Sequence, residues 1–127
     1  MDVMTANRER DHAMNKLTII GNLTRDPETR TVGDNDTVCT FTVAVNRRTH
    51  KDHPEADYFR VSAWNKLGEI AQQYLTKGKK VAVIGPVSVN TYEAKDGGGT
   101  RFKLEVRADD LELLSPRERG DADDSGY

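Results

Sequence analysis

The stretch that decides the fold is DYFRVSAWNKLGEIAQQYLTKGKKVAVIGPV, residues 57–87. It begins with an alternating run in which Phe59, Val61 and Ala63 fall on one side of a predicted strand. The opposite side carries larger or more polar side chains, namely Tyr58, Arg60, Ser62 and Trp64. The alternation predicts a half-buried strand whose outward side holds two aromatic rings and a guanidinium group.

A helix is expected directly after this strand. In NKLGEIAQQYLTKG the apolar side chains recur at helical spacing. Asn65 is the expected N-cap, and Gly78 is the expected left-handed residue after the last turn. The segment KKVAVIGPVSVNTY, residues 79–92, then predicts a long strand that is broken at Gly85-Pro86.

Strand-like segments flank this region on both sides. Residues 16–24, which contain a mid-strand glycine, and the alternating residues 37–47 lie upstream, and residues 101–107 lie downstream. Turn residues separate the strands at 26–28, 32–36 and 95–101. The order is three strands, a helix and two strands, and interrupting glycines suit a sheet that bends to close. We therefore predict an all-β fold with one helix: the OB-fold, a five-stranded Greek-key barrel with the helix between strands 3 and 4.

A single domain, residues 14–114, is expected to form the barrel. We expect residues 1–13 to be a disordered N-terminal extension, with Met14 as an alternative start, and residues 115–127 to be a short flexible acidic tail. The chain has 19 basic and 21 acidic residues, of which these two end segments hold 4 and 7. The barrel segment therefore has 15 basic and 14 acidic residues, and a net charge of +1 allows a local positive groove.

The cysteine content bears on the compartment. The single cysteine, Cys39, excludes an intrachain disulfide framework and favours a reducing, cytoplasmic environment. Its strand-like neighbours indicate a small buried hydrophobic residue rather than a nucleophile. No segment approaches the length of a membrane span, and the N-terminus lacks the apolar region of a secretory signal.

The sequence offers no recognisable catalytic or metal site. It contains no HExxH, nucleophile-elbow or P-loop motif, and the glycines at 97–99 fit a flexible turn rather than a phosphate cradle. The group His50, Asp52, His53 and Asp57 has none of the familiar ligand spacings, so a solvated loop is expected there. We expect a protein that is not an enzyme and that needs no cofactor.

Aromatic side chains on a solvent-facing sheet are platforms on which nucleic-acid bases stack. Tyr58 and Trp64 fit this pattern, and Arg60 between them is placed to pair with a phosphate or to stack on a base. Periodicity alone favours this interpretation no more than the alternative, in which another element or subunit covers the face. Tyr92, at the end of the fourth predicted strand, taken alone slightly favours packing across a hairpin.

Basic side chains gather at strand ends and in loops. One group follows the second predicted strand, another brackets the helix, and a third flanks the glycine turn. Each group alone is typical of solvated surface, whereas all three beside exposed aromatics favour a groove for a flexible polyanion. The groups are Arg47, Arg48 and Lys51; Lys66, Lys77, Lys79 and Lys80; and Lys95, Arg101 and Lys103.

Several segments together resemble the bacterial-type single-stranded DNA-binding protein family. They are NKLTIIGNLTRDPETR (15–30), FTVAVNR (41–47), the opening stretch (57–87) and NTYEAKDG (90–97), in the family's order. The resemblance implies an OB-fold that assembles as a homotetramer and wraps single-stranded DNA without strong sequence preference. It also implies a non-enzymatic, cytoplasmic and nucleoid-associated protein that protects DNA in replication, recombination and repair.

The resemblance also assigns roles by position. It places Tyr58, Trp64 and Tyr92 where the family stacks bases. Basic positions that match phosphate contacts are Lys16, Arg60, Lys66 and Lys77, and Phe59 matches a position in the subunit interface.

Two features differ from the family's pattern. Thr49 stands where the family often has a further aromatic, so one stacking platform is missing. The tail ends in DADDSGY, which only loosely matches the family's acidic tail with its hydrophobic tip. Recruitment of replication and repair proteins through this tail therefore stays open.

A second hypothesis is an OB-fold adaptor of the primosome type that acts mainly through protein contacts. It predicts a dimer and weak DNA binding. Replacing the three candidate stacking residues separates the two hypotheses. Each substitution should cost about 1–3 kcal/mol of DNA affinity if the protein is a single-stranded DNA binder, and little if it is an adaptor. A body of about 100 residues also builds a small core, which favours burial of part of an outward face between subunits.

Overall fold

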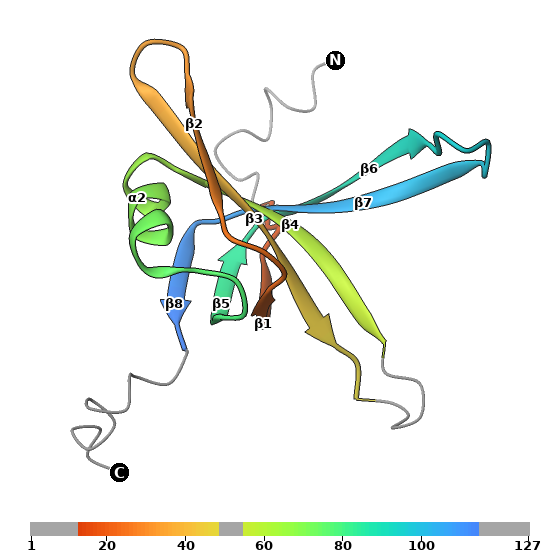
Figure 1. The fold of residues 1–127 in the computed structure, drawn as a ribbon, viewed down its shortest axis with the longest axis horizontal. Coiled ribbons are helices and arrows are strands. Elements are labelled where there is room, and N and C mark those ends of the chain that lie inside the picture. Colours follow the sequence, from red (N-terminus) through yellow and green to blue (C-terminus); the bar gives the residue numbers. More distant parts are fainter. Residues whose placement is uncertain (1–12, 49–54, 115–127) are drawn as a thin grey trace.

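The computed structural model describes residues 13–48 and 55–114, and its elements follow one another as Figure 1 shows. Their bounds are β1 Leu17–Leu23, β2 Glu28–Val32, β3 Asp36–Asn46, β4 Ala56–Trp64, α2 Asn65–Tyr74, β5 Lys80–Gly85, β6 Val87–Glu93, β7 Thr100–Arg107 and β8 Asp110–Leu113. The fold is mostly β-sheet with a helix between β4 and β5, which is consistent with the predicted OB-fold.

The sheet closes on itself because one long strand takes part in it twice. The strand order is β6-β7-β4-β3-β1-β5-β8, so β5 and β6 lie at distant places in the order. In the sequence, however, they are separated by Pro86 alone. β5 pairs with β1 and β6 pairs with β7, which joins the two sides into a barrel. The break predicted at Gly85-Pro86 is therefore the point at which this strand passes from one neighbour to the other.

Glycines stand where two strands meet too closely for a side chain. A Cβ on Gly85 would overlap the carbonyl oxygen of Arg107 in β7, and one on Gly21 in β1 would overlap that of Ala44 in β3. β1 pairs with β5 along most of its length and turns to β3 only at its end. The mid-strand glycine thus marks a close backbone approach, as the sequence predicted.

The core lies inside the barrel and is built mainly from small and β-branched residues. Its fully buried side chains include Val43, Val61, Val83 and Val106, which come from four different strands. The inward residues predicted for the opening strand behave as expected: Val61 and Ala63 are buried, and Phe59 is half-buried against the core. No polar or charged residue is buried among the residues described.

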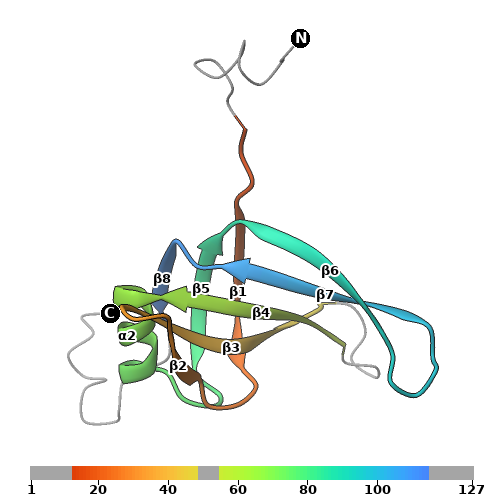
Figure 2. The ribbon, with the colours of Figure 1, turned by 90° about the horizontal axis from the view of Figure 1, so that it is seen from above.

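α2 packs against β3 and β4 at one end of the barrel (Figures 1 and 2). Gly68 allows the contact, because a Cβ there would overlap the carbonyl oxygen of Ala63. The predicted caps are wrong at both ends. Trp64 is the N-cap residue, whereas Asn65 is the first helical residue with φ of 50° and uses its side-chain oxygen to accept the N–H of Thr37. Leu75 is the C-cap residue, and Gly78 has the expected left-handed conformation, with φ of 89°, but lies in the following turn.

Two strands were not predicted. β2 forms a hairpin with β3 around the turn at residues 33–35, within the predicted turn at 32–36. β8 pairs with β5 at the other edge of the sheet. Because β2 adds a strand before the expected second one, the helix follows the fourth strand in chain order rather than the third.

Candidate nucleic-acid interface

The outward face of β2, β3, β4, β7 and β6 carries the three candidate stacking residues and three of the candidate basic residues, Arg60, Arg101 and Lys103. Directly paired residues of neighbouring strands share a face, so the register fixes which side chains lie in one row. Arg60 lies between Thr42 of β3 and Glu105 of β7, and Ser62 lies between Thr40 and Arg107. One row further, Trp64 lies opposite Val38, which in turn lies opposite Arg30 of β2.

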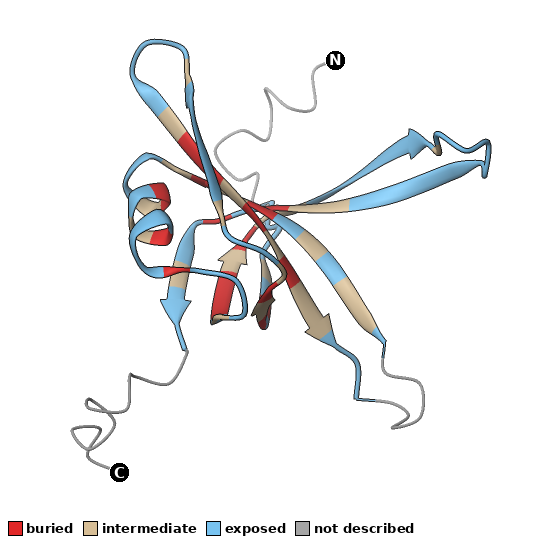
Figure 3. Cartoon of the chain, viewed as in Figure 1, coloured by how far each residue is buried: buried red, intermediate tan, exposed pale blue. Residues whose placement is uncertain are grey.

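β6 and β7 extend this face beyond the barrel as a two-stranded arm (Figures 1 and 2). Their register places Tyr92 opposite Arg101 and Asn90 opposite Lys103. Most of the arm is exposed (Figure 3), and the turn at its tip uses Gly97 and Gly99 at φ of 78° and 93°. Only residues without a Cβ adopt such angles at little cost, which explains the glycines predicted to form the tip.

Two tyrosines from different strands line one cavity beside this arm. A cavity of about 490 Å³ is lined by Tyr58 and Arg60 of β4, Tyr92 of β6 and Lys103 of β7. Tyr58 is 59% exposed and Tyr92 is 49% exposed. Their rings are thus accessible, and a basic group stands beside each of them. The arrangement offers stacking surface and positive charge together, which is what a flexible single strand requires.

Lys103 is the most constrained basic residue of this cavity. Its ammonium lies 5.9 Å from the centre of the Tyr92 ring and 4.0 Å from a carboxylate oxygen of Glu105. Glu105 also accepts a hydrogen bond of 2.5 Å from the side-chain amide of Asn90. These contacts hold Lys103 close to the aromatic ring, so that positive charge and stacking surface lie side by side.

Trp64 is half-buried and lies further along β4, away from the two tyrosines. Its partner Val38 belongs to the outward face, yet only 1% of that residue is exposed. The indole therefore covers an apolar neighbour and still leaves part of its surface open. Along the outward side of β4, the ring of Tyr58 is thus largely open and that of Trp64 is half-covered.

Arg47 makes two short ion pairs at the ends of β3 and β4. Its guanidinium lies 2.7 Å from Asp57 and 2.8 Å from Glu55, and its backbone N–H donates to the Glu55 carbonyl oxygen. The hydrogen bond from Arg47 holds the pKa of Asp57 below its ordinary value, and the same bond raises the pKa of Arg47. Arg47 thus joins the ends of β3 and β4 and offsets the charge of a carboxylate beside Tyr58.

The other predicted basic residues are exposed but spread widely. Arg48 follows β3, Lys66 lies in the first turn of α2, and Lys95 lies at the tip of the arm. Lys16 precedes β1, and Lys77 lies in the turn before β5. Arg101 joins the cross-strand row of Tyr92. Lys51 and Thr49 lie outside the described residues.

Sequence reasoning missed Arg25 and Arg30. Both are exposed, and both line cavities that also contain Arg60. Arg30 is brought to the outward face by β2, and Arg25 by the connection before it. Both arginines belong to the segment RDPETR, whose pattern predicts only a polar turn.

The candidate metal group was not expected to bind a metal, and most of it cannot be placed. His50, Asp52 and His53 lie outside the described residues, and Asp57 pairs with Arg47. Within residues 13–48 and 55–114, no three His, Cys, Asp or Glu side chains are grouped to hold an ion. The helix of this same part of the chain is too short and too polar to cross a membrane.

The thiol of Cys39, the chain's single cysteine, lies apart from the outward face. Cys39 is buried in the core, where burial raises the pKa of its thiol and a hydrogen bond with Thr29 opposes the shift. Its sulfur lies 4.0 Å from the side-chain oxygen of Gln72 in α2, and the hydroxyl of Thr29 also bonds to Gln72. The thiol therefore helps to join β2, β3 and α2, as the expected small buried residue.

Comparison with known proteins agrees with this geometry. The model described as "Single-strand binding protein family" matches residues 14–114. A single-stranded DNA-binding protein of Clostridium perfringens is 40% identical over 115 residues, which cover 90% of this chain and 75% of the relative. A protein of Clostridium tetani with the same name is 43% identical over 103 residues, covering 80% and 70%. Single-stranded DNA-binding protein 1 of Synechocystis is 34% identical over 116 residues, covering 91% and 96%. The chain belongs to the single-strand binding protein family.

Proposed function

We propose that this protein binds single-stranded DNA without sequence preference, stacking bases on Tyr58, Tyr92 and Trp64 and pairing phosphates with the basic groups beside them. The observation that carries the proposal is the cavity in which Tyr58, Arg60, Tyr92 and Lys103 converge from three strands. Stacking tolerates every base because each has a π-face, and the charges act on the backbone alone. The relatives described above are named single-stranded DNA-binding proteins, which supports the proposed ligand.

Titration with oligothymidine tests the proposal directly. Trp64 is the chain's single tryptophan, so its fluorescence reports contacts on the outward face of β4. We expect quenching on binding, and an affinity that falls as salt rises because phosphate pairing releases counterions. Unchanged Trp64 emission together with no mobility shift at saturating oligothymidine would contradict the proposal.

Two tyrosines of similar exposure provide a matched pair of variants. Tyr58 is 59% exposed in the cavity, whereas Tyr74 is 54% exposed at the end of α2, away from the outward face. Tyr58→Ala should weaken oligothymidine binding by about 1–3 kcal/mol, and Tyr74→Ala should leave it unchanged. Equal effects of the two substitutions, or no effect of either, would favour the adaptor hypothesis, in which protein contacts dominate.

We also propose that the protein acts as a homotetramer, with Phe59 near a subunit interface. Phe59 is half-buried between Val43 and Leu104, while Ile20 and Phe102 leave 50% and 72% of their surfaces exposed. Burying such surfaces against other copies is favourable and compensates for a small core. Multi-angle light scattering should give four chains, and a monomer at micromolar concentration would contradict the assembly.

The proposed cellular role is protection of exposed strands in DNA replication, recombination and repair, in the cytoplasm and at the nucleoid. A stacking and charge-pairing surface needs no chemical step, so we propose a binding protein without catalytic activity. Incubation of oligothymidine with the protein, with and without Mg²⁺, should leave the DNA intact.

A further inference from the structure

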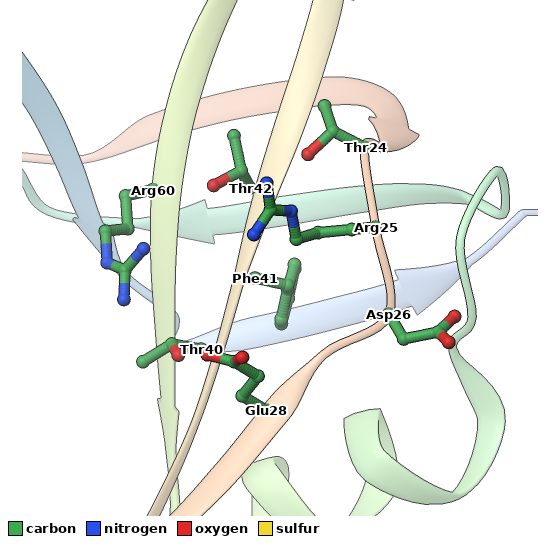
Figure 4. Close-up of a pocket in the computed structure, with 8 residues that line it drawn as sticks. All are labelled: Thr24, Arg25, Asp26, Glu28, Thr40, Phe41, Thr42 and Arg60. Carbon is green, nitrogen blue, oxygen red and sulfur yellow. The ribbon is translucent and has the colours of Figure 1, made fainter.

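A second cavity adjoins the tyrosine cavity and shares Arg60 with it. It measures about 370 Å³ and lies where the β1–β2 connection meets β3 and β4 (Figure 4). Arg25 lines it from the connection, Arg60 from β4, and Thr24 and Thr42 add hydroxyl groups. Figure 4 shows the side chain of Arg25 reaching across toward Thr42, so that guanidinium groups from separate segments border one hollow.

Arg25 is held in place through the residues on either side of it. The backbone N–H of Thr24 donates to the carbonyl oxygen of Thr42 at 3.0 Å, which fixes the connection to β3. The carboxylate of Asp26 accepts the backbone N–H of Lys77 at 2.8 Å, and this bond fixes the β1–β2 connection to the turn before β5. A basic side chain on an anchored backbone is better prepared to bind a ligand than one on a free loop, because less conformational entropy is lost.

The charges in this cavity favour an anion. Neither the Arg25 nor the Arg60 guanidinium forms an ion pair with any residue that the structure describes, in contrast to Arg47. Asp26 also lines the cavity, but its carboxylate accepts the backbone N–H of Lys77 and points away from both guanidinium groups (Figure 4). Glu28 also lines the cavity and opposes an anion there. Two guanidinium forks and two hydroxyls suit the oxygens of a phosphodiester.

We propose that Arg25 and Arg60 form a phosphate-binding subsite for single-stranded DNA, an inference that rests on the proposed function. Arg60 borders both cavities, so a strand that leaves Tyr58 passes it and reaches Arg25 next. Beyond Arg25 lies Lys77, which Asp26 brings to the same connection. The subsite thus joins Lys77, otherwise distant from the tyrosines, to one continuous route across the molecule.

The test compares oligothymidine with an oligonucleotide of the same length whose central nucleotides are abasic. Arg25→Gln removes the charge, and we expect roughly two- to tenfold weaker binding at low salt. The slope of log K against log salt should become shallower by about 0.7, the value for one phosphate contact in a single strand. Arg25→Gln should lose the same factor of affinity for both oligonucleotides. Tyr58→Ala should weaken binding only to the oligonucleotide that has bases throughout.

Three further variants sharpen the result. Arg25→Lys should keep the salt slope, because the charge remains. Glu28→Gln removes the opposing carboxylate and should tighten binding. Tyr74→Ala is the control, since Tyr74 lies exposed at the end of α2, away from the outward face, and its loss should leave the slope unchanged.

Particular outcomes would overturn the subsite without touching the proposed function. If Arg25→Gln leaves the slope unchanged while Tyr58→Ala still weakens binding, Arg25 contacts no phosphate. If Arg25→Gln weakens binding only to the oligonucleotide with bases, Arg25 contacts a base. Failure of the unsubstituted protein to bind oligothymidine would instead contradict the proposed function.

Discussion

The side-chain amide of Asn15 bonds to both backbone polar groups of Val87, as a neighbouring strand would. Its nitrogen donates to the Val87 carbonyl oxygen at 2.8 Å, and its oxygen accepts the Val87 N–H at 3.1 Å. This pair of bonds lies directly after Pro86, which has no N–H to give to a neighbouring strand. The amide thus satisfies the backbone at the point where the long strand passes from β1 to β7.

Asn15→Ala should lower the free energy of unfolding by about 1–3 kcal/mol, the sum expected for two hydrogen bonds. Urea denaturation followed by circular dichroism measures the loss. Asn35→Ala is the matched control, because Asn35 lies exposed in the β2–β3 turn and makes no side-chain hydrogen bond within the described part of the chain. Equal stabilities of the two variants would show that the Asn15 bonds do not support the barrel.

Gly85 is the second residue on which barrel closure depends. Gly85→Ala should destabilise the fold by about 3 kcal/mol or more, because the added methyl group would overlap the backbone of Arg107, which has no room to yield. Gly98→Ala is its control: there the nearest atom, at 2.9 Å, belongs to the flexible side chain of Asp96. Thermal unfolding should separate the two variants clearly, and a native-like melting temperature for Gly85→Ala would contradict the close approach.

The barrel strands were predictable because their signal is local. From Cys39 to Val43 in β3 and from Val61 to Trp64 in β4, buried residues alternate with more exposed ones, and the helix shows its own period. β2 carries no such signal: ETRTV is exposed at four of five positions, and hydrogen bonds to β3 place it. β8 has only four residues, and its pairing with the distant β5 is what makes it a strand.

The candidate site was predictable in its members but not in its grouping. Tyr58 and Tyr92 were singled out separately, yet they meet only because β7 pairs with both β4 and β6. The parallel β4–β7 pairing joins segments that the sequence pattern treats as unrelated. Arg25 escaped notice because its position opposite Arg60 depends on how the β1–β2 connection crosses β3.

The Arg47–Asp57 pair predicts a specific dependence on pH. Because the pKa of Asp57 is lowered in the folded state, its contribution to stability is complete above the unfolded-state pKa and is lost as pH falls through the folded-state pKa. Arg47→Gln should bring the Asp57 pKa back toward its ordinary value, measured by carboxyl carbon NMR during acid titration. Arg48→Gln removes a neighbouring charge that makes no such bond and should leave the shift in place; an unchanged Asp57 titration in Arg47→Gln would refute the pairing.

Trp64 should affect both stability and binding, whereas Tyr58 should affect binding alone. Trp64→Ala uncovers Val38, which is 1% exposed, and should cost about 1–3 kcal/mol of unfolding free energy as well as weakening oligothymidine binding. Tyr58→Ala removes a largely exposed ring and should change stability by less than about 0.5 kcal/mol. Trp64→Phe keeps a ring over Val38 and should retain most of both properties. Urea denaturation and oligothymidine titration of the three variants test this division, and a fully stable Trp64→Ala would show that Val38 is covered by other groups.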